Sequence, residues 1–142
     1  MKNISIIIKN GLIVTGGSLV SLAVAYGIYV FLFLTVREMA IQAGTFDLIS
    51  KVRIIYGISA ILICALIYRT RLIGWIKASV LAGALATMMI SIGVQMYEFK
   101  PFFFAIMILA VGLSVYLIHR MDLPWYHYYA ILISILATLF YL

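Results

Sequence analysis

Charged side chains in this chain are confined to a few narrow clusters, and long uncharged runs separate the clusters. The runs are Asn10 to Val36, Ile54 to Tyr68, Ala78 to Tyr97, Pro101 to His119 and Leu123 to Leu142. A charge at the centre of a lipid bilayer costs about 2.5 to 3.5 kcal/mol on insertion scales, so uncharged runs of this length are typical of helices embedded in hydrocarbon. The pattern therefore predicts an integral membrane protein.

The composition excludes a water-soluble fold and leaves no room for a separate soluble domain. The chain is 67% hydrophobic and 10% charged, whereas soluble domains are roughly 45 to 50% apolar and about 25% charged. A helix needs roughly 20 residues to cross the bilayer, so five crossings use about 100 residues. The connectors between them must be short.

We expect one polytopic domain over residues 1–142, an all-α integral membrane bundle of five transmembrane helices. The expected spans are about 11–35, 50–69, 77–97, 101–119 and 123–142. The second is the weakest, because the uncharged run between Arg53 and Arg69 is only about 22 Å long as a helix. If this segment does not cross, the bundle has four spans and the later helices reverse their orientation.

Local residues set the expected ends of the spans. Lys2 and Lys9 precede an apolar run of the kind found in signal peptides, but the run continues to Val36, so we expect an uncleaved first helix. Pro101 suits the first turn of the fourth span, where its missing N–H is not needed. We expect Asp122 to cap the fifth span, with Pro124 in its first turn.

The distribution of Lys and Arg favours an N-terminus inside the cell, in what we expect to be a prokaryotic cytoplasmic membrane. With five spans, six basic residues lie on the side of the N-terminus: Lys2, Lys9, Arg69, Arg71, Lys77 and Arg120. Four lie on the other side: Arg37, Lys51, Arg53 and Lys100. The side with more basic residues is normally the inner one. These positions at span ends also account for the net charge of +6, so we expect lipid contact and no nucleic-acid partner.

Small residues recur at every fourth position on two of the expected helices. They are Gly17, Ser21 and Ala25 on the first, and Ser79, Gly83, Thr87 and Ser91 on the third. Such series let helix backbones approach closely in lipid, so we interpret them as helix packing. The alternative is a polar seam that faces a pore or substrate path, formed by Ser79, Thr87, Ser91 and Gln95.

The segment from His119 to Tyr129 is the densest polar and aromatic cluster. Its candidate residues are His119, Arg120, Asp122, Trp125 and His127. Aromatic and basic side chains at this position are typical of an interfacial anchor, and the same residues could form a docking surface for lipid headgroups or a partner. Histidines on either side of a tight hairpin are poorly placed to hold a haem, and we expect no metal and no cofactor.

Three hypotheses about function remain open. The leading one is a non-catalytic subunit, assembly partner, immunity factor or regulatory factor of a membrane system, which would bind other membrane subunits or further copies of itself. It is favoured because the spans have packing faces but no ionisable relay. The alternative is a small oligomeric transporter or channel for an apolar or neutral solute. The third is an interfacial lipid-modifying enzyme that uses His119, Asp122 and His127.

Overall fold

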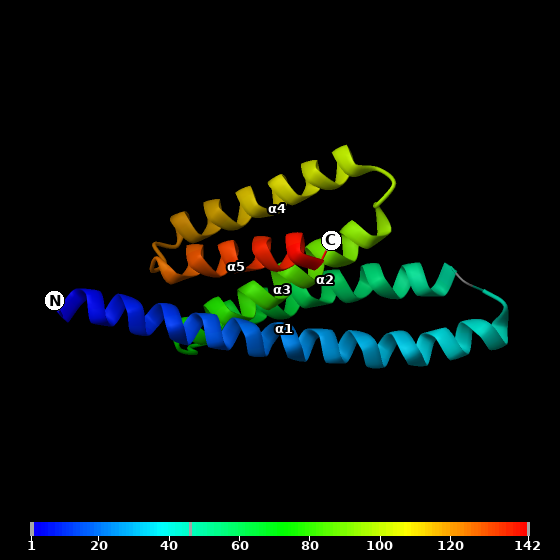
Figure 1. The fold of residues 1–142 in the computed structure, drawn as a ribbon, viewed down its shortest axis with the longest axis horizontal. Coiled ribbons are helices and arrows are strands. Elements are labelled where there is room, and N and C mark those ends of the chain that lie inside the picture. Colours follow the sequence, from blue (N-terminus) through cyan, green and yellow to red (C-terminus); the bar gives the residue numbers. More distant parts are fainter. Residues whose placement is uncertain (1, 46, 142) are drawn as a thin grey trace.

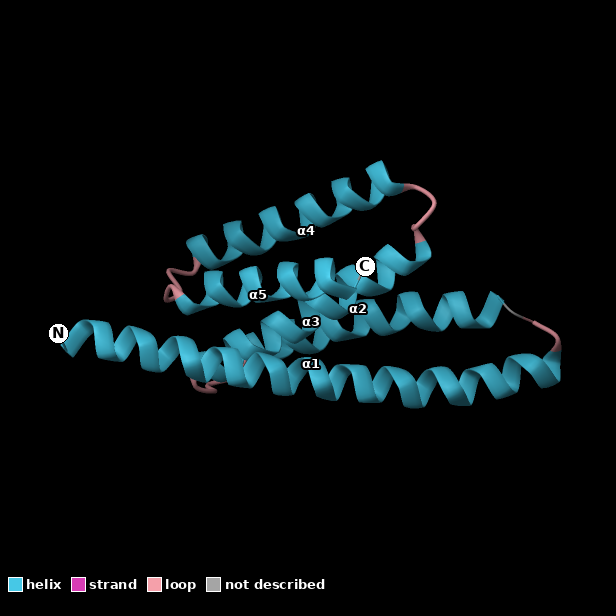
Figure 2. Ribbon diagram, viewed as in Figure 1, coloured by secondary structure: helices cyan, strands magenta, loops and turns pink. Residues whose placement is uncertain are grey.

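The computed structural model describes residues 2–45 and 47–141. Over these residues the chain forms five α-helices and no β-strand, and short loops connect the helices (Figure 2). The helices are α1 (Lys2–Ala43), α2 (Asp47–Arg69), α3 (Gly74–Gln95), α4 (Lys100–Arg120) and α5 (Tyr126–Tyr141). The expectation of an all-α protein is confirmed.

Four of the described helices, α1 to α4, are long and apolar enough to cross a membrane. The second expected span, over residues 50–69, contains only a short uncharged run, but the whole span lies within a longer helix. Helix α2 has 23 residues, about 34 Å, because it begins at Asp47, well before Arg53. The short helix is α5, whose 16 residues reach about 24 Å.

Helix α4 ends in a left-handed turn at Asp122, whose φ is 50°. The Asp122 N–H donates to the carbonyl of His119 and the Leu123 N–H donates to the carbonyl of Ile118, each at 3.2 Å. This pair of hydrogen bonds is a Schellman motif, which satisfies carbonyls that a helix end would leave unpaired. Asp122 therefore terminates α4.

The expectation that Asp122 caps the last helix, with Pro124 in its first turn, is wrong. Helix α5 begins at Tyr126, two residues after Pro124. The residue before a proline disfavours helical backbone angles, so Leu123 cannot readily begin a helix. The expected span over 123–142 therefore has a non-helical start, and its last residue, Leu142, lies outside the described residues.

Helix α1 is much longer than the span expected over residues 11–35. It has 42 residues, about 63 Å, which is twice the thickness of the hydrocarbon core. It stops where Gly44 takes a φ of 68° and the Thr45 N–H bonds the carbonyl of Ala40 at 3.2 Å. Figure 1 shows the N-terminal turns of α1 projecting past the other helices.

Helix α3 is the centre of the bundle. Within the described residues, the backbones of α1, α2 and α5 lie close to α3 over long stretches. The backbone of α4 comes close only to α3 and α5, and at few positions, because α4 packs there through larger side chains such as Phe103, Met107 and Ile118. Figure 1 shows α4 at the edge of the molecule. The buried residues of α3 are Ala78, Ser79, Ala82, Gly83, Ala84, Leu85, Ala86, Met89, Ser91 and Gly93. We call the end of the bundle that holds the start of α1 the amino end, and the other the opposite end.

Candidate functional site

The small residues of α1 and α3 meet in two successive pairs. A Cβ added at Gly17 would collide with the side chain of Ser79, and one added at Gly83 would collide with Ser21. The Ser79 hydroxyl donates to the carbonyl of Trp75 at 2.8 Å, within its own helix. At the amino end, the small-residue series of both helices therefore lies in a close helix contact.

The four residues of the predicted polar seam do not share one environment. Ser79 is buried against α1, and Gln95 is exposed at the end of α3. Thr87 and Ser91 line a cavity, and the Thr87 hydroxyl donates to the carbonyl of Gly83 at 2.7 Å. Only the middle of the series therefore faces an open space.

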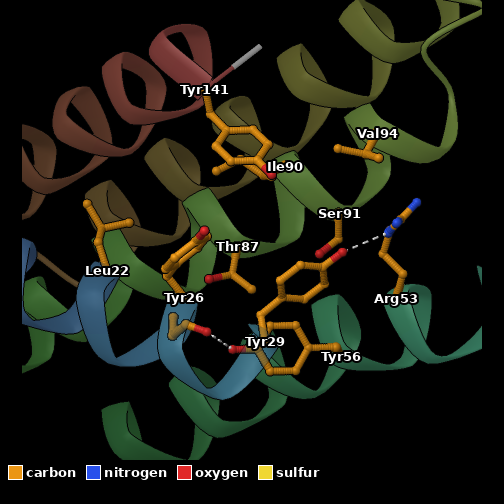
Figure 3. Close-up of a pocket in the computed structure, with 11 residues that line it drawn as sticks. Leu22, Tyr26, Tyr29, Arg53, Tyr56, Thr87, Ile90, Ser91, Val94 and Tyr141 are labelled. Atoms are coloured by element: carbon orange, nitrogen blue, oxygen red, sulfur yellow. Dashed lines mark hydrogen bonds between the residues drawn. The ribbon is translucent and has the colours of Figure 1, made fainter. Parts of the chain in front are cut away.

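This cavity, which we call the Arg53 cavity, has a volume of about 80 Å³ and lies between α1, α2, α3 and the end of α5 (Figure 3). Its polar side chains are Tyr26, Tyr29, Arg53, Tyr56, Thr87, Ser91 and Tyr141. None of the described residues that line it is acidic. The cavity thus combines one cation with several hydroxyl groups.

Two hydrogen bonds join α1 to α2 in the Arg53 cavity, and both are drawn in Figure 3. The Arg53 Nε donates to the Tyr29 hydroxyl at 3.2 Å, and the Tyr56 hydroxyl donates to the carbonyl of Ala25 at 2.5 Å. The rings of Tyr29 and Tyr56 lie 5.8 Å apart. Arg53 is half-buried, and the Tyr29 hydroxyl holds its side chain against α1.

Sequence reasoning missed the Arg53 cavity as a site. The two partners of its arginine contact, Tyr29 and Arg53, are 24 positions apart on different helices. No spacing rule connects residues across a long helix and a loop, so only the packing of α1 against α2 reveals the pair. The one local signal was an arginine that lies several residues inside α2.

A second polar cluster lies at the amino end, around His127. This histidine is fully buried, and its Nδ1 lies 2.7 Å from the Tyr68 hydroxyl. The ring of Tyr126 stacks on it with the centroids 4.9 Å apart, and the Lys77 ammonium donates to the carbonyl of Tyr68 at 3.3 Å. Within the described residues, the His127 Nε2 has no hydrogen-bond partner.

The candidate residues of the segment from His119 to Tyr129 divide into two groups. His127 points into the bundle, whereas His119, Arg120, Asp122 and Trp125 are exposed. In the part of the chain that the structure describes, no three His, Cys, Asp or Glu side chains are grouped closely enough to hold a metal ion. His127 therefore belongs to a buried contact with Tyr68, and the other four lie at the surface.

Comparison with known proteins gave no match among protein-family models, curated proteins or solved structures. The function of this chain is therefore inferred from its own residues and contacts.

Proposed function

We propose that this chain is a multi-pass membrane protein that acts as a non-catalytic subunit of a larger membrane system, as an assembly partner, immunity factor or regulatory factor. The observation that carries this proposal is the projecting start of α1. Residues 2–9 are all exposed, and Gly11 faces the ring of Trp125, just before α5.

The projecting segment is amphipathic. Ile4, Ile7 and Ile8 share one face, at the i, i+3, i+4 spacing of an apolar stripe, and each is about half or more exposed. Lys2 and Lys9 lie two turns apart on the other face. The stripe offers a partner helix a binding face with the i, i+3, i+4 spacing of helix anchors. A membrane-embedded partner chain would bury the three isoleucines.

The contacts of α3 also support a subunit without chemistry of its own. The hydroxyl groups of Ser79 and Thr87 donate to carbonyls of their own helix, and Ser79 is covered by α1. Both hydroxyl groups are therefore already bonded within α3, and Ser79 also lies in the close contact with α1. The exposed apolar surface of the outer helices is then the part of the chain that can bind another membrane subunit.

Site-specific crosslinking tests this proposal. A photoreactive residue placed at Ile7 in native membranes should give a discrete crosslinked protein, and one placed at Ser5, on the other helix face, should not. The triple variant Ile4→Ser, Ile7→Ser, Ile8→Ser should lose the partner on purification, while Ile6→Ser should retain it. A strictly monomeric protein in mild detergent, with no crosslink from position 7, would contradict the proposal.

We further propose five transmembrane crossings with the N-terminus inside a prokaryotic cytoplasmic membrane. The excess of Lys and Arg at the amino end supports this orientation, and residues 123–125 add length to the short α5. In a Cys64→Ala background, a cysteine at Lys100 should react with a membrane-impermeant reagent from outside. Reaction only from the cytoplasm would overturn this topology.

A small oligomeric transporter or channel for a neutral solute is the second candidate, favoured by the Arg53 cavity. Thr87 and Ser91 both line it, which gives part of the polar series an open space to face. Thr87→Val keeps the shape and removes the hydroxyl, so it should lower solute flux in liposomes. Thr35→Val is the control, because Thr35 is exposed and makes the same type of bond to its own helix. Equal flux in both variants would remove this candidate.

A further inference from the structure

An apolar groove separates α2 from α4. These two helices do not touch within the described chain, and α3 forms the floor between them with Leu81, Leu85 and Met88. The groove has a volume of about 380 Å³, and its walls are the facing sides of α2 and α4. Among the described residues, no side chain of α1 lines the groove.

The groove covers one half of the bilayer thickness. On α4 its lining runs from Ala110 to Met121, about 16 Å along the helix, and the hydrocarbon core is about 30 Å thick. On α2 it runs from Ile61 to Arg69. Both stretches begin near the middle of their helix and finish at the amino end. A transmembrane partner helix needs a face of full thickness, whereas one acyl chain needs only one leaflet.

The mouth of the groove is positively charged. Arg69 and Tyr68 line it at the amino end, and the exposed residues Arg71 and Arg120 lie close in sequence to its two walls. The acidic residue at this end of the described chain is Asp122, which lies between the lining residues Met121 and Leu123, and three arginines therefore face one carboxylate around the mouth. Arginine presents several donors in a planar fork, which matches the oxygens of a phosphate group.

We propose that the α2–α4 groove binds an anionic phospholipid from the leaflet at the amino end. The phosphate group lies at Arg69, and one acyl chain lies along Leu81 and Leu85 between the two helices. Basic pockets between transmembrane helices are known to select anionic headgroups. The lipid fills the space between α2 and α4, whose backbones do not come close within the described chain, so it links these two helices.

Photo-crosslinking with lipids tests the site on the purified full-length protein. The probes are phosphatidylglycerol and phosphatidylcholine with the same photoreactive acyl chain, each added to bilayers that contain equal amounts of the two lipids. We expect phosphatidylglycerol to crosslink preferentially to residues 61–69 and 110–121. Arg69→Gln should lower this crosslinking roughly fivefold, whereas Arg37→Gln, at the opposite end, should leave it unchanged.

A second pair of variants tests the groove separately from the charge. Ala65 lines the groove, so Ala65→Phe should reduce crosslinking of either lipid there. Ala105→Phe, on an exposed part of α4 outside the groove, should have no effect. Each variant is first checked for a single symmetric peak in size-exclusion chromatography.

Three results would overturn the proposal. Equal crosslinking of the two lipids in the groove would mean that ordinary bulk lipid fills it. Crosslinks spread evenly over α1 and α5 would mean that there is no site. Crosslinks between two copies of the chain through α2 and α4 would mean that a second copy occupies the groove. None of these results bears on the partner surface of α1.

Discussion

The two sides of α3 are built in different ways. Toward α1, Gly17 and Gly83 bring the backbones so close that no added Cβ fits. Toward α4, the contacts are few and an apolar groove remains. Lipid tails are as apolar as leucine, so helices in a membrane associate through close packing rather than through hydrophobic burial. Helices α1 and α3 are therefore joined by close backbone contact, whereas α4 packs on α3 and α5 through larger side chains and leaves a groove beside α2.

A large loss of stability is expected when the close α1–α3 contact is disrupted. Gly83→Ala places a Cβ against the Ser21 side chain and 3.3 Å from its backbone carbonyl carbon, so the free energy of unfolding should fall by about 1 to 3 kcal/mol. Gly112 on α4 has nothing within 4 Å of an added Cβ. Gly112→Ala should therefore be neutral or stabilising, by up to about 1 kcal/mol. Denaturation in mixed micelles measures the free energy of unfolding of both variants. Equal losses would contradict the difference between the close α1–α3 contact and the surroundings of Gly112 on α4.

A somewhat smaller effect is expected at the buried amino end. Tyr68→Phe removes the hydroxyl that lies 2.7 Å from the His127 Nδ1 and leaves a fully buried nitrogen unpaired. This should lower the free energy of unfolding by about 1 to 3 kcal/mol. Tyr128→Phe, on the exposed face of the same region, is the control and should change it by less than about 0.5 kcal/mol. Equal changes in the two variants would show that the contact does not contribute.

Loss of the Arg53 hydrogen bond in the Arg53 cavity should lower the free energy of unfolding by a smaller amount. Tyr29→Phe removes the acceptor of the Arg53 hydrogen bond, at a cost of about 0.5 to 1.5 kcal/mol. Water and headgroups reach the half-exposed guanidinium and replace part of the lost bond, which favours the lower value. Tyr26→Phe changes another tyrosine that lines the same cavity and is the matched control. A loss in Tyr26→Phe as large as in Tyr29→Phe would argue against the Arg53 contact.

The smallest effect is expected on the outer face of α4. Leu109 is 70% exposed, so Leu109→Ala should change the free energy of unfolding by less than about 0.5 kcal/mol. Leu85→Ala, in the core beneath the groove, provides the contrast because Leu85 is 1% exposed, and it should cost about 2 to 5 kcal/mol. A large loss at Leu109 would mean that α4 packs on something not present in the isolated chain.

Much of the fold could be predicted from where the charges lie. The all-helical class is confirmed, and four helices have the length and apolar character of membrane spans. The helix ends could not be predicted in the same way, because a charge marks the edge of hydrocarbon and not the end of a helix. Helix α1 continues past Arg37 and Glu38 to Ala43, and the backbone of Asp122 ends α4 instead of starting α5.

The candidate sites were less predictable, because they depend on contacts between distant helices. The position of His119 and His127 in one short segment indicated a shared surface, yet the first turn of α5 directs His127 inward to Tyr68. The groove between α2 and α4 has no sequence signal at all, since it results from how far α4 stands from α2. Periodicity identifies which residues share a helix face but not which helix will lie opposite.

Spin-label distances test the difference between the two sides most directly. In a Cys64→Ala background, one labelled pair at Phe31 and Gln95 reports on α1 and α3, and a second at Leu62 and Leu109 reports on α2 and α4. The first pair should give a narrow distance distribution that does not depend on lipid. The second should be broad in phosphatidylcholine and become narrower when phosphatidylglycerol is added. If both distance distributions were narrow and did not change with the lipid, the claim of a close α1–α3 contact and a lipid-filled groove between α2 and α4 would be contradicted.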